Sequence, residues 1–363
     1  MSRFDVIIVG AGIAGASLAA ELAPHASVLL LEAEDQPGYH ATGRSAAFWS
    51  ETYGGPHIQP LTSASGPWLR EHGLLTPRGE LYLARENDRP ALDRFAAEFQ
   101  GRVELERWPA AEARRWLPGL RADWAEALWM PSCQDIDVAG AHQQFLKLAR
   151  QAGAKLHCSA PLERAERTGS CWRVEAGGGD WEAELLVNAA GAWADRVAML
   201  AGVAPLGITP YRRTVVQLLV DPPAPPDLPL VMATDGSFYF KPDSGRVWLS
   251  PHDETPVEPG DVAPEELDVA IAIDRFEGAV DWPIARVERR WAGLRSFAPD
   301  RLPVYGYDSG VPSFFWCAGQ GGFGIQTAPA AARISAGLLL NRVSGDIDPA
   351  PYLPDRLRSG FDA

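Results

Sequence analysis

Cysteine is scarce in this chain of 363 residues. Four cysteines occur, spaced far apart and without a CxxC pair: Cys133, Cys158, Cys171 and Cys317. Zinc sites and disulfide frameworks need paired or closely spaced cysteines, so we expect neither. The histidines also lack metal-ligand spacing, and no metal site is predicted. A reducing cytoplasm is the expected location.

Positive charge is also in short supply. Lys and Arg number 33 against 47 Asp and Glu, which gives a formal net charge of -14. Surfaces that bind nucleic acids are rich in Lys and Arg, so a nucleic-acid partner is not expected. An acidic chain of this kind suits a protein that binds small molecules, and a local basic pocket is still allowed.

The chain lacks a long uninterrupted hydrophobic run. Its most apolar stretch, residues 6–22, is broken by glycines at turn-like positions, so we expect no transmembrane segment. The N-terminus has neither the basic start nor the small-residue cleavage site of a signal peptide, and export is not expected. With 46% hydrophobic and 22% charged residues, the chain is predicted to be globular and long enough for two interleaved domains.

The first residues carry the clearest pattern. An apolar strand is predicted over Phe4–Val9 and a helix over Ile13–Leu22, with GAGIAG between them. In this G-x-G-x-x-G motif, Gly10 permits a tight turn, Gly12 lets the backbone approach a pyrophosphate, and Gly15 lets the helix pack close to the strand. Phosphates would lie at the helix N-terminus.

A second apolar strand, Ser27–Leu31, ends in Glu32. A carboxylate at this point can accept hydrogen bonds from an adenosine ribose. The order strand, glycines, helix, strand and acid indicates a dinucleotide-binding unit, but it does not choose between NAD and FAD.

The segment after this acid, GYHATGRSAAFWSETYGGPHI, has the composition expected of a segment that binds a flat ligand. Its small residues Ser45, Ala46 and Ala47 would let the backbone pass against a ring system. Arg44 could neutralise a phosphate, support the turn, or remain a surface charge.

Two later segments repeat the strand, small residues, helix order. A strand over Leu185–Asn188 leads into small residues and a helix, which allows a second close approach to a dinucleotide. Near the C-terminus a strand precedes a glycine cluster and a helix from about Thr327. A helix N-terminus there would stabilise negative charge on a bound ring.

Together, GAGIAGAS, QPGYHATGRSAA, LVNAAGAWAD, SFYFKP, WAGLRSF and GQGGFGIQT span nearly the whole chain. In these motifs the sequence resembles the FAD-dependent amine and amino-acid oxidoreductases, which include D-amino-acid oxidase, glycine oxidase and sarcosine oxidase. Within that family it looks most like D-arginine dehydrogenase. The resemblance implies FAD as cofactor, bound by Gly10, Gly12, Gly15, Glu32, Arg44, Ser45, Ala46, Ala47, Ala190, Gly191, Gly321, Gly322, Gly324, Ile325 and Gln326.

The fold class that follows is α/β, with a Rossmann-like FAD-binding domain interleaved with an antiparallel-sheet substrate domain. We expect residues 1–80, 137–205 and 296–363 in the first domain, and residues 81–136 and 206–295 in the second. In the second domain, the pattern from about Tyr82 to Pro131 is mostly helical. Strands are predicted over Tyr211–Val220, Ser237–Lys241 and Arg246–Ser250, and the acidic stretch 252–268 as a solvated loop leading into a helix.

An enzyme that oxidises an amino acid must first hold its carboxylate, for which bidentate arginine is suited. The resemblance places Arg295 and Arg213 in this role. Because side chains alternate along a strand, only one of Arg212 and Arg213 can face the pocket, and we expect Arg213. Tyr239 is expected to meet the carboxylate, and Tyr53 to shape the pocket, although either could be a core tyrosine.

The substrate side chain is expected to depend on Glu80. A buried acid there would favour a guanidinium or ammonium, as the resemblance to D-arginine dehydrogenase implies, whereas an exposed Glu on an edge strand would leave a pocket for neutral amino acids. One position differs from D-arginine dehydrogenase: this chain has Phe48 where that enzyme has a histidine in its pocket. His40 could lie near the flavin or make a structural hydrogen bond.

The predicted function is therefore oxidation of D-amino acids, preferably D-arginine or D-lysine. Hydride would pass from Cα to flavin N5, and the imino acid would hydrolyse to a 2-oxo acid and ammonia. Either oxygen or a quinone could accept the electrons. The alternatives are oxidation of neutral amino acids, N-methyl amines or 2-hydroxy acids, a non-catalytic flavin-binding protein, and an NAD-dependent dehydrogenase.

Overall fold

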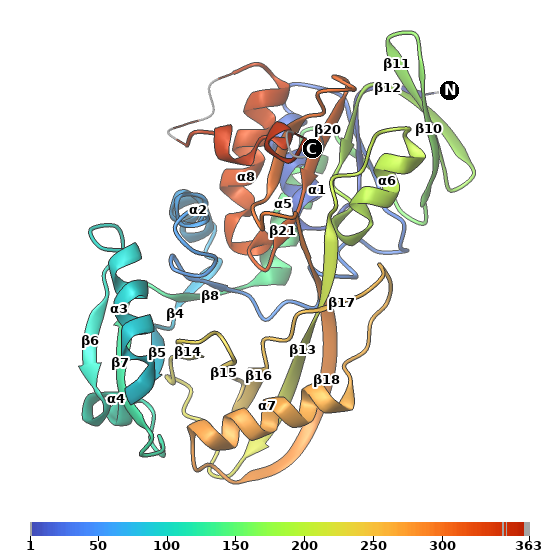
Figure 1. Cartoon of the computed structure of the whole chain (residues 1–363). Coiled ribbons are helices and arrows are strands. Elements are labelled where there is room, and N and C mark those ends of the chain that lie inside the picture. The colour runs from blue at the N-terminus through green and yellow to red at the C-terminus, as the bar shows by residue number, and fades with distance from the viewer. Residues whose placement is uncertain (1, 343–344, 346, 359–363) are drawn as a thin grey trace.

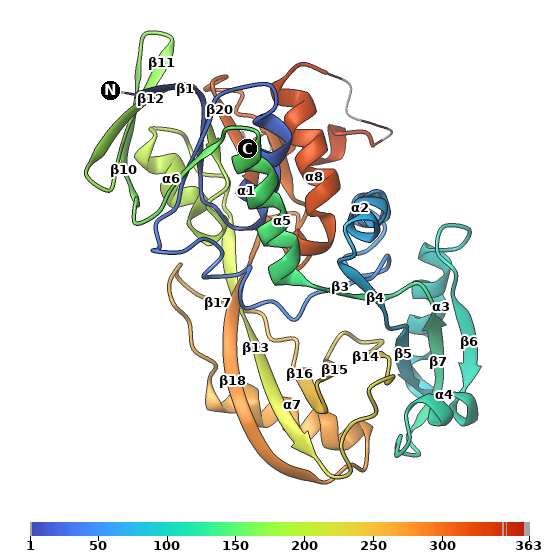
Figure 2. The ribbon, with the colours of Figure 1, turned by 180° about the vertical axis from the view of Figure 1, so that it is seen from behind.

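The structure is a computed structural model that describes residues 2–342, 345 and 347–358. Within these residues the chain forms two large sheets and a small one, with helices packed on both large sheets (Figures 1 and 2). The predicted segment 296–363 extends over residues 343–344, 346 and 359–363, which lie outside the described residues.

The first large sheet contains the N-terminal strand at its centre. Its strand order is β10-β11-β12-β1-β2-β9, with β20 beside β12 and β19 beside β20. The pairs of β1 with β12 and β2 are parallel, as are β2 with β9 and β12 with β20. The strands are β1 (Ser2–Val9), β2 (Val28–Leu31), β9 (Lys155–His157), β10 (Leu162–Thr168), β11 (Cys171–Ala176), β12 (Gly179–Asn188), β19 (Val304–Tyr307) and β20 (Phe314–Ala318).

Helices cover this sheet on both faces because alternate residues of β1 are apolar on both sides. Ile8 packs into a core with α1 (Ile13–Leu22), α5 (Val138–Gln151) and α8 (Gly324–Leu339), whereas Ile7 packs into a core with α6 (Ala194–Leu200). A further helix, α2 (Gln59–Glu71), lies against α8 (Figure 1). The layering is that of a dinucleotide-binding fold, as predicted.

The second large sheet has the order β21-β18-β13-β16-β15-β14-β5-β7-β6, and β17 pairs with β13. One face is covered by α7 (Glu266–Ala279), and α3 (Arg89–Glu98) and α4 (Ala110–Trp116) lie near its far end. The strands are β5 (Glu80–Arg85), β6 (Glu106–Pro109), β7 (Trp124–Met130), β13 (Thr209–Val220), β14 (Leu230–Ala233), β15 (Tyr239–Asp243), β16 (Arg246–Ser250), β17 (Thr255–Pro256), β18 (Ile284–Phe297) and β21 (Gln320–Gly321). A small sheet of β3 (Phe48–Trp49), β8 (Gln134–Ile136) and β4 (Leu75–Pro77) lies between the two.

Successive stretches of the chain contribute strands first to one large sheet and then to the other, and the changes fall close to the predicted boundaries. The division into two domains stays a prediction. Two features of the second sheet differ from expectation. It is not wholly antiparallel, because β14 and β5 pair in parallel. The stretch 82–131 is less helical than predicted, since β6 and β7 lie within it: β7 packs apolar residues on both of its faces and therefore lacks a simple alternating pattern.

Candidate active site

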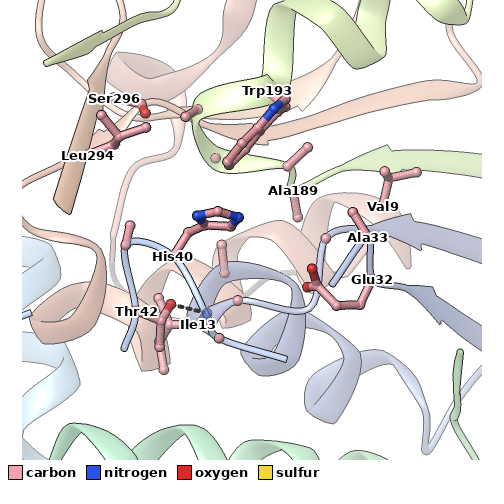
Figure 3. Close-up of a pocket in the computed structure, with 18 of the residues that line it drawn as sticks. Val9, Ile13, Glu32, Ala33, His40, Thr42, Ala189, Trp193, Leu294 and Ser296 are labelled. Atoms are coloured by element: carbon pink, nitrogen blue, oxygen red, sulfur yellow. Dashed lines mark hydrogen bonds between the residues drawn. The ribbon is translucent and has the colours of Figure 1, made fainter. Parts of the chain in front are cut away.

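A cavity of about 330 Å³ runs along the edge of the first sheet to the end of β18 in the second. Figure 3 shows Glu32 and Ala33 at one end of this cavity, Leu294 and Ser296 at the other, and His40 and Trp193 between them. The predicted cofactor residues that line it are Gly10, Gly12, Glu32, Ser45, Ala190, Gly191, Gly321, Gly322, Gly324 and Ile325.

The glycine motif occupies one side of the cavity. Gly10 has φ +100°, which side-chain-bearing residues rarely adopt. A Cβ on Gly15 would lie 1.9 Å from the Gly10 carbonyl oxygen, so Gly15 does not line the cavity but lets α1 pack against the turn. The Glu32 carboxylate accepts a hydrogen bond from the Ala11 N–H (2.9 Å), and it faces the cavity at the point expected for a ribose.

The middle of the cavity is lined by aromatic side chains. The His40 ring packs against Trp193, with 4.5 Å between ring centroids, and its Nε2 lies 2.7 Å from Glu34 Oε1. Thr42 Oγ1 accepts a hydrogen bond from the Ile13 N–H at the start of α1 (Figure 3). His40 therefore does both things considered for it: it lines the cavity and makes a structural contact.

At the other end, α8 points its N-terminus at the cavity. The helix begins at Gly324, three residues before the predicted start, and no side chain caps it. A Cβ at Gly324 would lie 3.2 Å from the Gln320 Cβ, closer than most side-chain contacts, so the packing here favours glycine at the first helical position. The uncapped N–H groups leave partial positive charge at this end of the cavity.

Some predicted cofactor residues do not line the cavity. Arg44 instead pairs with Asp261 (2.6 Å), and its backbone carbonyl accepts a hydrogen bond from Trp291 Nε1. These contacts fasten the turn to β18, which is one of the roles considered for Arg44. Ala46 packs beside Phe48 in a buried cluster, and Ala47 packs against the core of the first sheet.

Gln326 is also buried away from the cavity. Its Nε2 donates to the Tyr53 carbonyl (3.1 Å) and to Thr62 Oγ1 (2.8 Å). Gln326 therefore holds the segment that carries Tyr53 in place.

Four of the predicted substrate residues, Arg295, Arg213, Tyr239 and Tyr53, lie close together near the β18 end. Arg295 is buried and lines the cavity, and among the described residues it has no ion-pair partner. Tyr239 is buried, and the Phe48 ring lies 5.8 Å from its ring and 5.1 Å from that of Tyr53. Burial raises the pKa of the Tyr239 hydroxyl, against the opposing effect of the Arg213 charge.

The two adjacent arginines of β13 face opposite sides of the sheet. Arg212 binds Glu265 and Asp268 at the start of α7. Arg213, on the Tyr239 side, donates from Nε to the Asp253 carbonyl (2.9 Å) and pairs with Glu254 (3.0 Å). Phe238 and Phe240 pack on the α7 side, so Tyr239 points away from them as expected.

Glu80 is fully buried and does not line the cavity. Its strand β5 lies between β14 and β7, so the exposed edge-strand alternative is wrong. Ser50 Oγ donates to Glu80 Oε2 (2.7 Å), while Oε1 accepts no hydrogen bond of normal geometry. Burial raises the pKa of this carboxyl to about 7, despite the opposing effects of Ser50, Tyr82 and Cys133, whose side chains lie beside it.

His252 is a residue beside the candidate site that the sequence did not reveal. It begins the stretch predicted as a solvated loop, yet its ring centroid lies 5.7 Å from that of Tyr239 and 6.2 Å from that of Tyr53. The next two residues of the stretch, Asp253 and Glu254, hold Arg213. Loop composition does not separate such residues from solvated ones, and only the end of the preceding strand could have drawn attention to them.

The fold and the cavity define a flavoprotein-like oxidoreductase with a dinucleotide site on one sheet and a buried arginine over its far end. The chain belongs to the DAO family of FAD-dependent oxidoreductases, whose sequence pattern matches residues 5–338. FAD is accordingly the cofactor, and the residues present fit it: the glycine turn, Glu32 and the uncapped start of α8 lie in order along one elongated cavity.

Individual relatives agree with this assignment. A glycine oxidase of Pseudomonas aeruginosa PAO1 is 26% identical over 96% of this chain and 98% of its own length. The crystal structure of glycine oxidase from Geobacillus kaustophilus has a TM-score of 0.85 and 25% identity, covering 97% of this chain and 98% of that one. L-α-glycerophosphate oxidase from Mycoplasma pneumoniae, solved with FAD bound, shares the fold at 17% identity and a TM-score of 0.85, with coverage of 96% and 97%.

Within the described residues, no helix is long and apolar enough to cross a membrane.

Proposed function

We propose that the protein oxidises the Cα–N bond of an amino acid, and that its preferred substrates are D-amino acids with a basic side chain. The observation that carries the reaction class is Arg295, a buried guanidinium that has no ion-pair partner among the described residues and faces the end of the FAD cavity. A substrate carboxylate is the partner that such a group lacks. The glycine oxidases among the relatives act on an amino acid, which supports the same class.

In this proposal the side chains chiefly orient the substrate. Arg295 and the Tyr239 hydroxyl hold the carboxylate, and Tyr53 and Phe48 close the pocket around the reacting carbon. The flavin, when bound, supplies the hydride acceptor. Arg213 attracts the substrate carboxylate through its charge without binding it directly, because its guanidinium already donates hydrogen bonds to Asp253 and Glu254.

The preference for a basic side chain rests on Glu80. Its Oε1 is buried without a hydrogen bond of normal geometry, and it belongs to the face of the second sheet that also carries Tyr239. A guanidinium or ammonium would supply a well-placed donor and favour the ionised carboxylate. Phe48 belongs to the buried cluster on the same face of the sheet. The D configuration rests on the resemblance alone.

The test is anaerobic bleaching of the bound flavin by D-arginine, D-lysine, D-leucine, D-proline, sarcosine, glycine, L-arginine and 2-hydroxyglutarate in parallel. Fast bleaching by D-arginine and D-lysine alone is the expected result. Equal bleaching rates with D-arginine and D-leucine, unchanged in a Glu80→Ala variant, would contradict the preference for basic side chains. They would leave the proposed oxidation of amino acids intact. No bleaching by any compound would support a non-catalytic flavin protein.

A variant pair tests the carboxylate anchor. Arg295→Ala should weaken substrate binding about 100-fold, because hydrogen bonds between charged groups are lost from a buried site. Arg212→Lys is the matched control: it changes an arginine on the other side of the sheet and keeps its charge, so substrate binding should stay within about twofold. Unchanged binding by the Arg295 variant at full flavin content would contradict the assignment.

A further inference from the structure

His252 is held in an unusual and well-defined position. Its backbone has φ +56°, a left-handed conformation that is costly for a residue with a side chain. Its N–H donates to Ser250 Oγ (3.1 Å) at the end of β16, and Asp253 beside it accepts from the Thr214 N–H (2.6 Å). The loop is thus fastened to β13 and β16 on either side of the ring, and strain of this kind gathers at functional sites.

The hydrogen bond of the ring decides which nitrogen is free. Nδ1 lies 2.6 Å from the Gly236 carbonyl oxygen, which can only accept, so Nδ1 carries the proton. In the neutral ring Nε2 is then an acceptor, and among the described residues it has no hydrogen-bond partner. Burial, followed by the charge of Arg213, lowers the pKa of His252 to about 3, and Arg295 and Arg301 act in the same direction. The imidazole is therefore neutral near neutral pH.

The surroundings of the ring point to the substrate. His252 packs edge-on against Tyr239 (82° between ring planes) and lies tilted against Tyr53, both of which belong to the pocket proposed above. The nearby cations Arg213, Arg295 and Arg301 can only donate hydrogen bonds, so a neutral acceptor here complements them. A substrate with its carboxylate on Arg295 and Tyr239 carries its amino group one carbon away from that carboxylate.

We propose that His252 is a substrate-binding residue whose Nε2 accepts a hydrogen bond from the substrate's α-amino group, and that it thereby selects amines. This inference rests on the proposed function. With Arg295 it divides recognition of the substrate into two parts: the arginine binds the acid and the imidazole binds the amine. No proton transfer to the ring is involved.

Two substitutions separate this role from a structural one. His252→Asn tolerates the left-handed backbone and can still donate to Gly236 from its amide, but it has no atom at the position of Nε2. His252→Gln is longer and can present an amide oxygen near that position. The probes are D-arginine and its deamino analogue 5-guanidinopentanoate, or D-leucine and 4-methylpentanoate if D-leucine bleaches the wild-type flavin faster.

The measurement is the dissociation constant of each probe, taken from perturbation of the flavin spectrum by the deamino analogue and from the concentration dependence of bleaching by the amino acid. Flavin content and melting temperature are recorded for each variant. We expect His252→Asn to weaken the amino acid about tenfold, to leave the analogue within about twofold, and His252→Gln to recover part of the loss. A scaffold role would weaken both probes together.

Equal weakening of amino acid and analogue, wild-type binding of both, or equal losses in the Asn and Gln variants would each overturn the inference while leaving the proposed function intact. Failure of every amino acid to bleach the wild-type flavin would overturn both.

Discussion

The charge state of single side chains in this protein depends on burial as much as on residue type. Glu80, Arg295 and His252 are all titratable and all poorly solvated. Burial raises the pKa of Glu80 and lowers those of Arg295 and His252, and each shift favours the neutral form of the side chain. The sequence identified the first two through a resemblance and through the chemistry of their side chains. It did not identify His252, because no periodicity distinguishes a histidine that turns back into the protein from one that faces water.

Glu80 should make the stability of the protein depend on pH. Its pKa is about 7 in the folded protein and 4.5 in the unfolded chain, so between these values the folded state binds more protons. Stability must then fall as pH rises through this window, by up to about 3 kcal/mol for this one group. Glu80→Gln removes the titration.

The measurement is urea unfolding of wild type and Glu80→Gln between pH 5 and 8. We expect the difference in free energy of unfolding to move in favour of the Gln variant as pH rises. A difference that is constant over this range would mean that Glu80 is ionised throughout.

At the level of elements, close packing of α1 against the β1 turn is the feature on which we expect cofactor binding to depend. The helix bounds Ile13–Leu22 were predicted correctly, as were the strands on either side to within a few residues. Strong periodicity and the glycine spacing made this possible. By contrast, β6 and β7 were missed, because β6 is four residues long and mostly exposed and β7 packs apolar residues on both of its faces, so neither strand shows a clear alternating pattern.

Gly15→Ala should disrupt this packing. Its Cβ would lie 1.9 Å from the backbone at Gly10, and neither backbone segment can move without shifting the phosphate site. We expect loss of most bound FAD, read as the flavin-to-protein absorbance ratio, and a lower melting temperature.

Gly278→Ala is the control for this change. Gly278 lies near the end of α7, its φ is not positive, and no atom lies within 4 Å of the place that a Cβ would take. Alanine there should preserve flavin content and add up to about 1 kcal/mol of stability through helix propensity. Equal flavin content in both variants would show that the close contact of Gly10 with Gly15 is not needed.

For the whole molecule, the chain passes repeatedly between the two large sheets, and the cavity takes residues from both. Leu294, Arg295 and Ser296 come from the second sheet, while most of the lining comes from the first. The general architecture followed from the order of motifs. The pairing of β5 with β14, which seals Glu80 inside the sheet, could not follow from sequence because it joins segments about 150 residues apart.

Bound FAD should therefore stabilise both sheets at once. We expect the holoprotein to unfold in one transition, with tryptophan fluorescence and flavin release coincident, and the apoprotein to melt at a lower temperature. Differential scanning calorimetry with and without FAD measures this. Two separate transitions in the holoprotein, only one of them sensitive to FAD, would indicate that the sheets are energetically independent.

The neighbouring arginines of β13 have a consequence for the comparison of distant relatives. Because Arg212 and Arg213 lie on opposite faces, a misalignment by one residue still matches arginine with arginine, although it replaces an arginine bound to α7 with one on the Tyr239 side of the sheet. The apolar side chains of Val216, Leu218 and Val220, all on the α7 side, carry the correct register. In an alignment of relatives, an insertion or deletion at this point would therefore show as a mismatch of the hydrophobic residues, whereas the arginines would still match.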